Sequence, residues 1–232
     1  YGNRHARLPI DWKNGIFGGS ITPEDVFPMV LIGRYISPFV RRVAVSLHYL
    51  DIPFESKPLS LISEMPDIEQ HNPLGRVPAL ILDDGRTLID SAAILDHIDA
   101  LVGPDRALLP MNAPTRQLVL QLVAYATGTL ERVMNAVAEE NRPVEKQIAE
   151  RTSRFDRQSA VGLSALENIV QSWEWSVGER LTQSEIISTI TTTYIQRMRP
   201  HLWDGAIYPT LATITSKCEN LPAFRDAPFD VS

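Results

Sequence analysis

The sequence has a single cysteine, no long apolar run and no cluster of basic residues, and each shortage excludes a class of protein. Cys218 is the only cysteine among 232 residues, so intrachain disulfides and CxxC redox or zinc motifs are excluded. No apolar run approaches the ~20 residues that a membrane-spanning helix needs. The first residues also lack the apolar core of a signal peptide. We therefore expect a protein of a reducing compartment, the cytosol.

The charges of the two signs are nearly balanced, with 22 Lys/Arg against 28 Asp/Glu residues. The formal net charge is −6 and 44% of the residues are apolar, which is typical of a soluble globular protein. Because no Lys/Arg-rich stripe is available to neutralise phosphates, nucleic acid is not an expected partner. The length of 232 residues favours two domains over one.

The composition and the spacing of apolar residues change along the chain, and these changes predict its domains. Residues 1–28 are rich in glycine and proline, and form either an arm packed on the protein or a segment foreign to it. Residues 29–103 mix strand and helix patterns, and residues 104–114 are a proline-punctuated linker. Residues 115–232 are helical in pattern throughout.

The first half predicts the order βα, β, ββα. The run "VLIGRY" suits a buried strand, and apolar residues at helical spacing follow in residues 37–52. Residues 53–59 form another short extended segment, and the prolines and glycine of "EMPDIEQHNPLGR" predict turns.

The end of this half predicts a hairpin and a helix. Asp84-Gly85 marks the hairpin turn, and the next helix begins at Ser91 and stops at Gly103-Pro104. In the second half, apolar periodicity predicts helices over residues 115–140, 144–173, 184–198 and 206–219.

Three short motifs carry candidate chemistry, and the first is Ser37-Pro38. Ser37 can cap a helix while Pro38 occupies the first helical position. A hydroxyl beside the exposed N–H groups of a helix end also stabilises anions such as a thiolate, whose thiol has an ordinary pKa of about 8.5. The motif fits either a plain helix start or one that also binds a thiolate.

The second motif is "NPLGRVPAL", residues 72–80. Pro78 begins a strand, a position that proline tolerates at a sheet edge or at a strand start. An edge strand would leave Val77 free to pair with an extended peptide, and a cis Val77–Pro78 bond would hold its backbone groups outward. A plain turn followed by a strand fits the same residues.

The third motif is Asp90-Ser91, just before a predicted helix. The helix amino terminus behind Ser91 can hold a carboxylate, and Asp90 can hold an ammonium group. A simple helix cap is the alternative. Taken together, the three motifs describe a pocket for a short peptide that carries a thiol.

With these motifs in this order, residues 30–228 resemble the soluble glutathione transferases. "SPFVRRV" is similar to the active-site stretch of serine-type members, such as tau-like plant and many bacterial ones. "NPLGRVPAL" is similar to the cis-proline loop of the family, and "LIDSAAILDHID" to its glutamyl-binding helix start. The resemblance implies an α/β thioredoxin-like amino-terminal domain followed by an all-α domain, with glutathione as co-substrate, a homodimer and a role in detoxification.

The resemblance also implies roles for residues. Ser37 would be catalytic, donating a hydrogen bond to the glutathione thiolate, and Tyr35 is the rival donor. Val77 would pair with the cysteinyl backbone, while Asp90 and Ser91 would hold the γ-glutamyl end. The expected glutathione-binding set is Phe39, His71, Arg76, Val77, Pro78, Asp90 and Ser91, with no metal site.

Two positions depart from the family pattern. Glu64 stands where tau-like members carry a lysine for the glycyl carboxylate, so Arg76 or His71 would have to replace that lysine. In the second half, Thr189 stands where we expect the acid of a helix-capping box.

The second substrate is not specified by any motif. Candidate lining residues between the domains are Phe39, Tyr125, Thr129 and Met134, although such residues at helical spacing are more often core. Trp173, Trp175 and Cys218 are expected to serve packing.

The leading hypothesis is therefore a glutathione transferase whose bound thiolate attacks a small apolar electrophile. The alternatives are a glutathione-dependent isomerase or disulfide reductase, and a protein that keeps the fold without catalysis.

Overall fold

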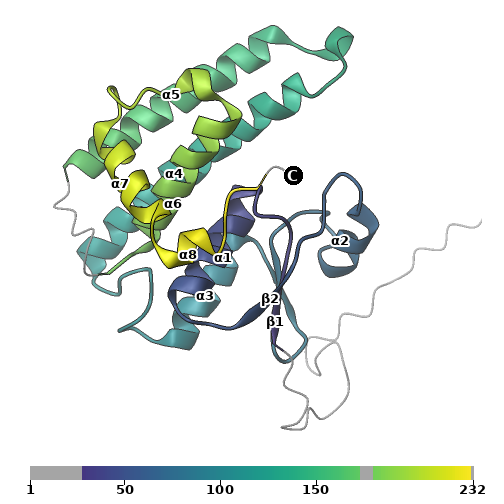
Figure 1. Cartoon of the computed structure of the whole chain (residues 1–232), viewed down its shortest axis with the longest axis vertical. Helices are drawn as coiled ribbons and strands as arrows, with labels where there is room; N and C mark the ends of the chain where they lie inside the picture. Colours follow the sequence, from purple (N-terminus) through teal and green to yellow (C-terminus); the bar gives the residue numbers. More distant parts are fainter. Residues whose placement is uncertain (1–27, 173–179, 231–232) are drawn as a thin grey trace, which may run out of the picture.

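The computed structural model describes residues 28–172 and 180–230, as an α/β half followed by a helical half (Figure 1). The predicted arm and the two tryptophans Trp173 and Trp175 lie outside the described residues. The first half contains β1 (Met29–Ile32), α1 (Pro38–Tyr49), β2 (Phe54–Lys57), α2 (Met65–His71), β3 (Ala79–Ile81), β4 (Thr87–Ile89) and α3 (Ser91–Val102). The second contains α4 (Ala113–Glu140), η1 (Val144–Lys146), α5 (Ala149–Gln171), α6 (Gln183–Met198), η2 (Pro200–Leu202), α7 (Pro209–Glu219) and α8 (Pro222–Arg225).

The four strands form one mixed sheet in the order β2-β1-β3-β4. Strand β1 runs parallel to β2 and antiparallel to β3, and β3 pairs with β4 in the hairpin predicted from Asp84-Gly85. This is the expected thioredoxin-like arrangement.

Alternating side chains of the sheet enter two cores. Leu31 and the opposite Leu80 are fully buried in the main core, whose members also come from α1 and α3. Their neighbours Ile32 and Ala79 join a small second core with Ile68 of α2. Successive side chains of a strand point to opposite faces of the sheet, so both faces of this sheet are covered by a core.

Of the two positions expected for Pro78, the strand start is confirmed and the sheet edge is wrong. Strand β3, which begins just after Pro78, lies between β1 and β4 and so has neighbours on both sides. Proline stands there because it precedes the paired residues of β3, which begin at Ala79. Val77 lies in the loop just before β3, outside the paired residues of the sheet.

Helix α2 was predicted only as turns. It has seven residues and only Ile68 is buried, so the apolar periodicity that reveals longer helices is missing. Pro66 in its first turn helps it to start.

The helical half packs α4 against α5 and α6, and α6 against α7. Helix α6 is the central element, with buried residues from Gln183 to Ile195. Its amino terminus corrects the interpretation of Thr189, which lies in the middle of α6. A complete capping box is formed by Thr182 and Glu185, since Thr182 Oγ1 accepts from Ser184 N and the Glu185 carboxylate accepts from Thr182 N.

Two buried arginines of α1 join the halves. Arg41 donates to both carboxylate oxygens of Glu219 at 2.8 and 2.7 Å and to the Ala227 carbonyl oxygen at 2.8 Å. Arg42 Nε donates to Gln183 Oε1 of α6 at 2.8 Å. The main core likewise contains residues of both halves.

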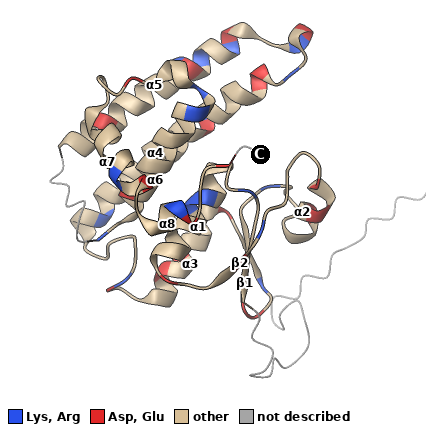
Figure 2. Cartoon of the chain, in the orientation of Figure 1, with Lys and Arg blue, Asp and Glu red and all other residues tan. Residues whose placement is uncertain are grey.

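Lys/Arg and Asp/Glu residues are interspersed over both halves (Figure 2). No helix within the described ranges is long and apolar enough to cross a membrane.

Candidate functional site

Ser37 is the N-cap of α1. Its backbone is extended, with φ −69° and ψ 118°, and its side-chain oxygen accepts from Val40 N at 3.4 Å. Pro38 follows in the first turn, where its missing N–H leaves no intrahelical bond unmade. Because the Ser37 oxygen is the acceptor in the cap, its hydroxyl proton stays available to an anion at the helix end.

Gly33 allows the loop before Ser37 to approach the cis-proline loop. Its φ is +120°, and a Cβ there would lie 2.7 Å from Val40 Cγ2 and 2.9 Å from Val77 Cβ. Only glycine fits both the dihedral and the space. The absence of a side chain thus brings the start of α1 next to Val77.

The loop from residue 72 to 78 is held from inside. The Asn72 side chain donates to the Arg76 carbonyl oxygen at 2.7 Å and accepts from Leu74 N at 3.0 Å. The Val77–Pro78 peptide bond is cis, as the resemblance implied. Asn72 therefore fixes the part of the chain that presents Val77.

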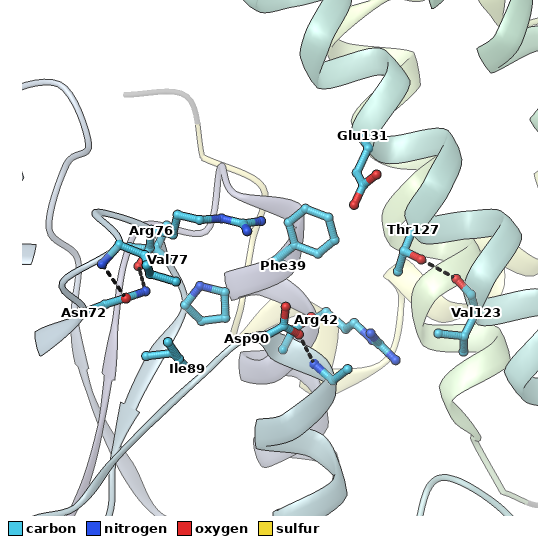
Figure 3. Close-up of a pocket in the computed structure, with 14 residues that line it drawn as sticks. Phe39, Arg42, Asn72, Arg76, Val77, Ile89, Asp90, Val123, Thr127 and Glu131 are labelled. Atoms are coloured by element: carbon cyan, nitrogen blue, oxygen red, sulfur yellow. Dashed lines mark hydrogen bonds between the residues drawn. The ribbon is translucent and has the colours of Figure 1, made fainter. Parts of the chain in front are cut away.

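Asp90 and Ser91 begin α3. Asp90 has φ 71°, and its Oδ1 accepts from Ala92 N at 2.8 Å, so the motif is a true N-cap. The second carboxylate oxygen of Asp90 is outside this bond and faces the cavity described next (Figure 3). Ser91 is 5% exposed.

Two adjoining cavities connect these motifs. The first, of about 220 Å³, is lined by Phe39, Arg42, Asn72, Leu74, Arg76, Val77, Pro78, Ile89, Asp90, Ser91, Ala92, Val123, Thr127 and Glu131. The second, of about 390 Å³, is lined by Arg34, Ile36, Ser37, Pro38, Phe39, Leu59, Ser60, Leu61, Ile62, Gly75, Arg76, Val77, Met134, Asn141 and Tyr194. Phe39, Arg76 and Val77 line both, so the two cavities meet at these residues.

The charges around the first cavity are mixed. Figure 3 shows the Arg76 side chain extending across the cavity towards Phe39, with Glu131 of α4 pointing in from the opposite side. Burial lowers the pKa of the Arg42 guanidinium to about 10, partly offset by Asp90 and Asp99, so Arg42 is charged at neutral pH. The cavity therefore offers positive and negative groups to a zwitterionic ligand.

Three of the predicted residues lie outside both cavities. His71 ends α2 with its Nε2 3.4 Å from Lys57 Nζ, and burial together with Lys57 lowers the pKa of His71, which makes it a poor anion partner. Glu64 lines neither cavity, and its Oε2 accepts a hydrogen bond from Ser60 N at 2.8 Å. Tyr35 packs against the main core.

The predicted lining is half correct. Phe39 and Met134 line the second cavity, but Tyr125 and Thr129 lie on another face of α4, in a groove shared with α5. Helical spacing alone does not tell which face of a long helix meets which neighbour.

Cys218 is fully buried, and burial raises the pKa of its thiol to about 11, which suits a packing residue.

Six polar or charged residues line the cavities without having been predicted: Arg34, Arg42, Thr127, Glu131, Asn141 and Tyr194. Arg42 lies in the quoted "SPFVRRV" stretch, and a charged residue on the apolar face of a predicted helix is a signal that was available. Arg34 stands three residues before Ser37 and reaches the second cavity from the same loop. Thr127, Glu131, Asn141 and Tyr194 have no local signal, because only the packing of the two halves brings them to the cavities.

Comparison with known proteins agrees with this geometry. The family model for the glutathione S-transferase amino-terminal domain matches residues 31–106. YibF of Escherichia coli, named an uncharacterized GST-like protein, is 32% identical over 145 residues, covering 60% of this chain and 68% of that protein. A probable maleylacetoacetate isomerase of Drosophila melanogaster is 28% identical over 213 residues, covering 88% of each chain.

Among solved structures, a glutathione S-transferase of Methylobacterium radiotolerans in complex with glutathione sulfonate superposes with a TM-score of 0.81. It is 27% identical, and the match covers 88% of this chain and 96% of that one.

Proposed function

Because this chain belongs to the glutathione transferase superfamily, we propose that it binds glutathione and holds its thiol as a thiolate for attack on a small apolar electrophile. The observation that carries the proposal is the position of Ser37, which caps α1 and lines the second cavity. Val77 lines this cavity as well as the first, which Asp90 also lines. A hydrogen bond to the charged form, helped by the helix field, lowers a thiol pKa from about 8.5.

The remaining contacts follow from the two ends of the tripeptide. Val77 would pair with the cysteinyl backbone, and Asp90 with the α3 amino terminus would hold the ammonium and carboxylate of the glutamyl end. Arg76 is the candidate partner of the glycyl carboxylate, since it lines both cavities and His71 lines neither.

The test is a titration of glutathione, followed by the ultraviolet absorbance of the bound thiolate against pH. The wild type should show thiolate well below the ordinary pKa of about 8.5. Ser37→Ala should return the pKa towards that value while glutathione still binds, because the backbone and glutamyl contacts remain.

Tyr35→Phe is the matched control and should leave the thiolate pKa unchanged, since Tyr35 packs against the main core and lines neither cavity. Loss of the shift in Tyr35→Phe alone would transfer the role to Tyr35. Binding without any shift in the wild type would favour a non-catalytic binding protein.

A second candidate function is a glutathione-dependent isomerase. The relative named a probable maleylacetoacetate isomerase is aligned over 88% of this chain and supports it. An isomerase adds the thiolate to its substrate and later expels it, whereas a transferase keeps it in the product. Measuring free glutathione during turnover of a cis-configured enone separates the two, because only a transferase consumes it.

We also propose that the protein is a cytosolic homodimer. Leu74, 66% exposed, and the exposed Leu118 and Leu120 of α4 offer apolar surface for a two-fold contact. Light scattering of the wild type and Leu74→Glu tests this, and a monomeric wild type at micromolar concentration would contradict it.

A further inference from the structure

Arg34 lies in the turn that leads into the start of α1. Its carbonyl oxygen accepts from Ser37 N at 3.0 Å, and Gly33, directly before it, lies against Val77 of the cis-proline loop. Both ends of this short turn are therefore fixed by their contacts. The Arg34 side chain lines the second cavity, which Ser37 also lines.

The guanidinium of Arg34 is a cation without a partner in the fold. The residue is half-buried, and its side chain makes no hydrogen bond or ion pair with any of residues 28–172 and 180–230. The two arginines that follow in α1 are engaged, since Arg41 binds Glu219 and Arg42 binds Gln183. Withdrawing a charge from water is costly unless an opposite charge compensates it, so Arg34 is suited to bind an anion from the cavity.

The charges around the second cavity also favour an anion. Arg34 and Arg76 are both in its wall, and none of its described lining residues is an aspartate or a glutamate. The first cavity differs, because Asp90 and Glu131 are in its wall. The cavity in which the second substrate would be seated therefore carries positive charge alone.

Glutathione has no third carboxylate for Arg34. In the proposed function, the amino terminus of α3 holds its glutamyl carboxylate and Arg76 holds its glycyl carboxylate. The thiolate is assigned to Ser37. Arg34 is thus left for the other substrate.

The remaining wall describes the body of that substrate. Ile36, Phe39, Leu59, Leu61 and Met134 give this cavity of about 390 Å³ an apolar lining, which suits a small organic molecule. A guanidinium fork matches a carboxylate in geometry as well as in charge, because two parallel N–H···O bonds can form.

We propose that the second substrate is a small electrophile with an apolar body and a carboxylate, and that Arg34 binds this carboxylate. The inference rests on the proposed function, because the attacking group is the glutathione thiolate. Arg34 would determine specificity without entering the reaction, since the carboxylate is equally bound before and during the attack. Such uniform binding lowers KM and leaves kcat unchanged.

Two electrophiles of the same shape and different charge test the inference, 4-chloro-3,5-dinitrobenzoate and 4-chloro-3,5-dinitrobenzamide. With each, the thiolate sulfur forms a bond to the ring carbon that carries chlorine, and chloride leaves with the electron pair of the broken bond. Arg34→Gln should raise the KM for the benzoate by about 10- to 100-fold. The kcat for the benzoate and both constants for the benzamide should stay as in the wild type.

The control variants separate charge, geometry and fold. Arg34→Lys keeps the charge without the two-pronged contact and should give an intermediate KM for the benzoate. Arg197→Gln is the matched control, since Arg197 is an exposed arginine of α6 that lines neither cavity, and it should behave as the wild type. Thermal unfolding and the thiolate titration of each variant check that the fold and the glutathione site are intact.

A binding measurement makes the result independent of turnover. The probe 3,5-dinitrobenzoate, which has no leaving group, is titrated by calorimetry into the protein saturated with S-methylglutathione, whose sulfur cannot attack. The wild type should bind this probe about 10- to 100-fold more tightly than Arg34→Gln does. The two proteins should bind 3,5-dinitrobenzamide equally.

Three outcomes would overturn the inference. The first is equal affinity of the wild type and Arg34→Gln for 3,5-dinitrobenzoate. The second is a raised thiolate pKa in Arg34→Gln with equal losses on both electrophiles, which would make Arg34 a partner of the thiolate. The third is weaker binding of glutathione by Arg34→Gln, which would make Arg34 a partner of the glycyl carboxylate.

In all three the proposed function stands if the thiolate shift depends on Ser37. A wild type without bound thiolate would remove both the proposed function and the inference.

Discussion

Asp90 combines two tasks that substitution can separate. Its Oδ1 caps α3 through Ala92 N, its φ of 71° suits Asp, Asn or Gly, and its charge faces the first cavity. Asp90→Asn keeps the cap and the backbone preference but removes the charge. We expect unfolding free energy within about 0.5 kcal/mol of the wild type, and glutathione affinity lower by about 10- to 100-fold, the worth of a hydrogen bond to a charged group.

Calorimetric titration with glutathione and urea denaturation measure the two effects. Asp90→Ala is the comparison, because it loses the cap as well, at a cost of about 1 kcal/mol. If Asp90→Asn bound glutathione as the wild type does, the role of Asp90 would be that of a helix cap alone.

At this scale the sequence was informative where chemistry coincides with local structure. Ser37 and Asp90 could be predicted because a helix cap has a sequence signal that extends over only a few residues. Glu131 and Tyr194 could not, since each belongs to a helix whose face towards the cavities is chosen by the packing of the two halves.

At the scale of the elements, helices α4 and α5 pack closely at a glycine. A Cβ on Gly162 of α5 would lie 2.0 Å from Thr129 Oγ1 and 3.1 Å from Thr129 Cβ. Gly162→Ala should therefore destabilise the protein by about 1–3 kcal/mol, the usual cost of overpacking. Thr129→Ala in the same chain should recover most of that loss, because it removes the closest atom.

Urea denaturation of the two single variants and the double variant gives the coupling between them. Gly128→Ala is a control on the opposite helix, since a Cβ there meets nothing within 4 Å. Additive effects of Gly162→Ala and Thr129→Ala would show that the helices move apart instead of colliding at this point.

The predicted elements were most reliable where helices are long. In the second half, α4, α5, α6 and α7 lie close to the predicted positions, whereas the four-residue α8 has no counterpart among the predicted helices. The capping box of α6 is formed by Thr182 and Glu185, away from the predicted position at Thr189. The sequence "TQSE" contains the signal, because a threonine precedes a glutamate by three residues.

For the molecule as a whole, the two halves should unfold together. The main core draws on both, and Arg41, 1% exposed, is bound to Glu219 and the Ala227 carbonyl from the far end of the chain. Arg41→Met would leave the Glu219 carboxylate, 29% exposed, without its main partner, and should cost about 3 kcal/mol or more.

Urea denaturation followed by circular dichroism and by tryptophan fluorescence measures this cost and the cooperativity. The two probes should give coincident single transitions in the wild type. Arg41→Lys is the graded control, because lysine keeps the charge but not the two-pronged contact. Two separate transitions in the wild type would mean that the halves are independent.

The contacts of α1 also bear on how such a protein can be recombined. Arg41 and Arg42 belong to the first half, whereas their partners Glu219 and Gln183 lie in the second. A chimera that joins this first half to the helices of a relative would inherit two buried guanidinium groups without assured acceptors. Exchange at the linker therefore separates each buried arginine from its acceptor. A functional hybrid requires that the residues at positions 183 and 219 are kept together with helix α1.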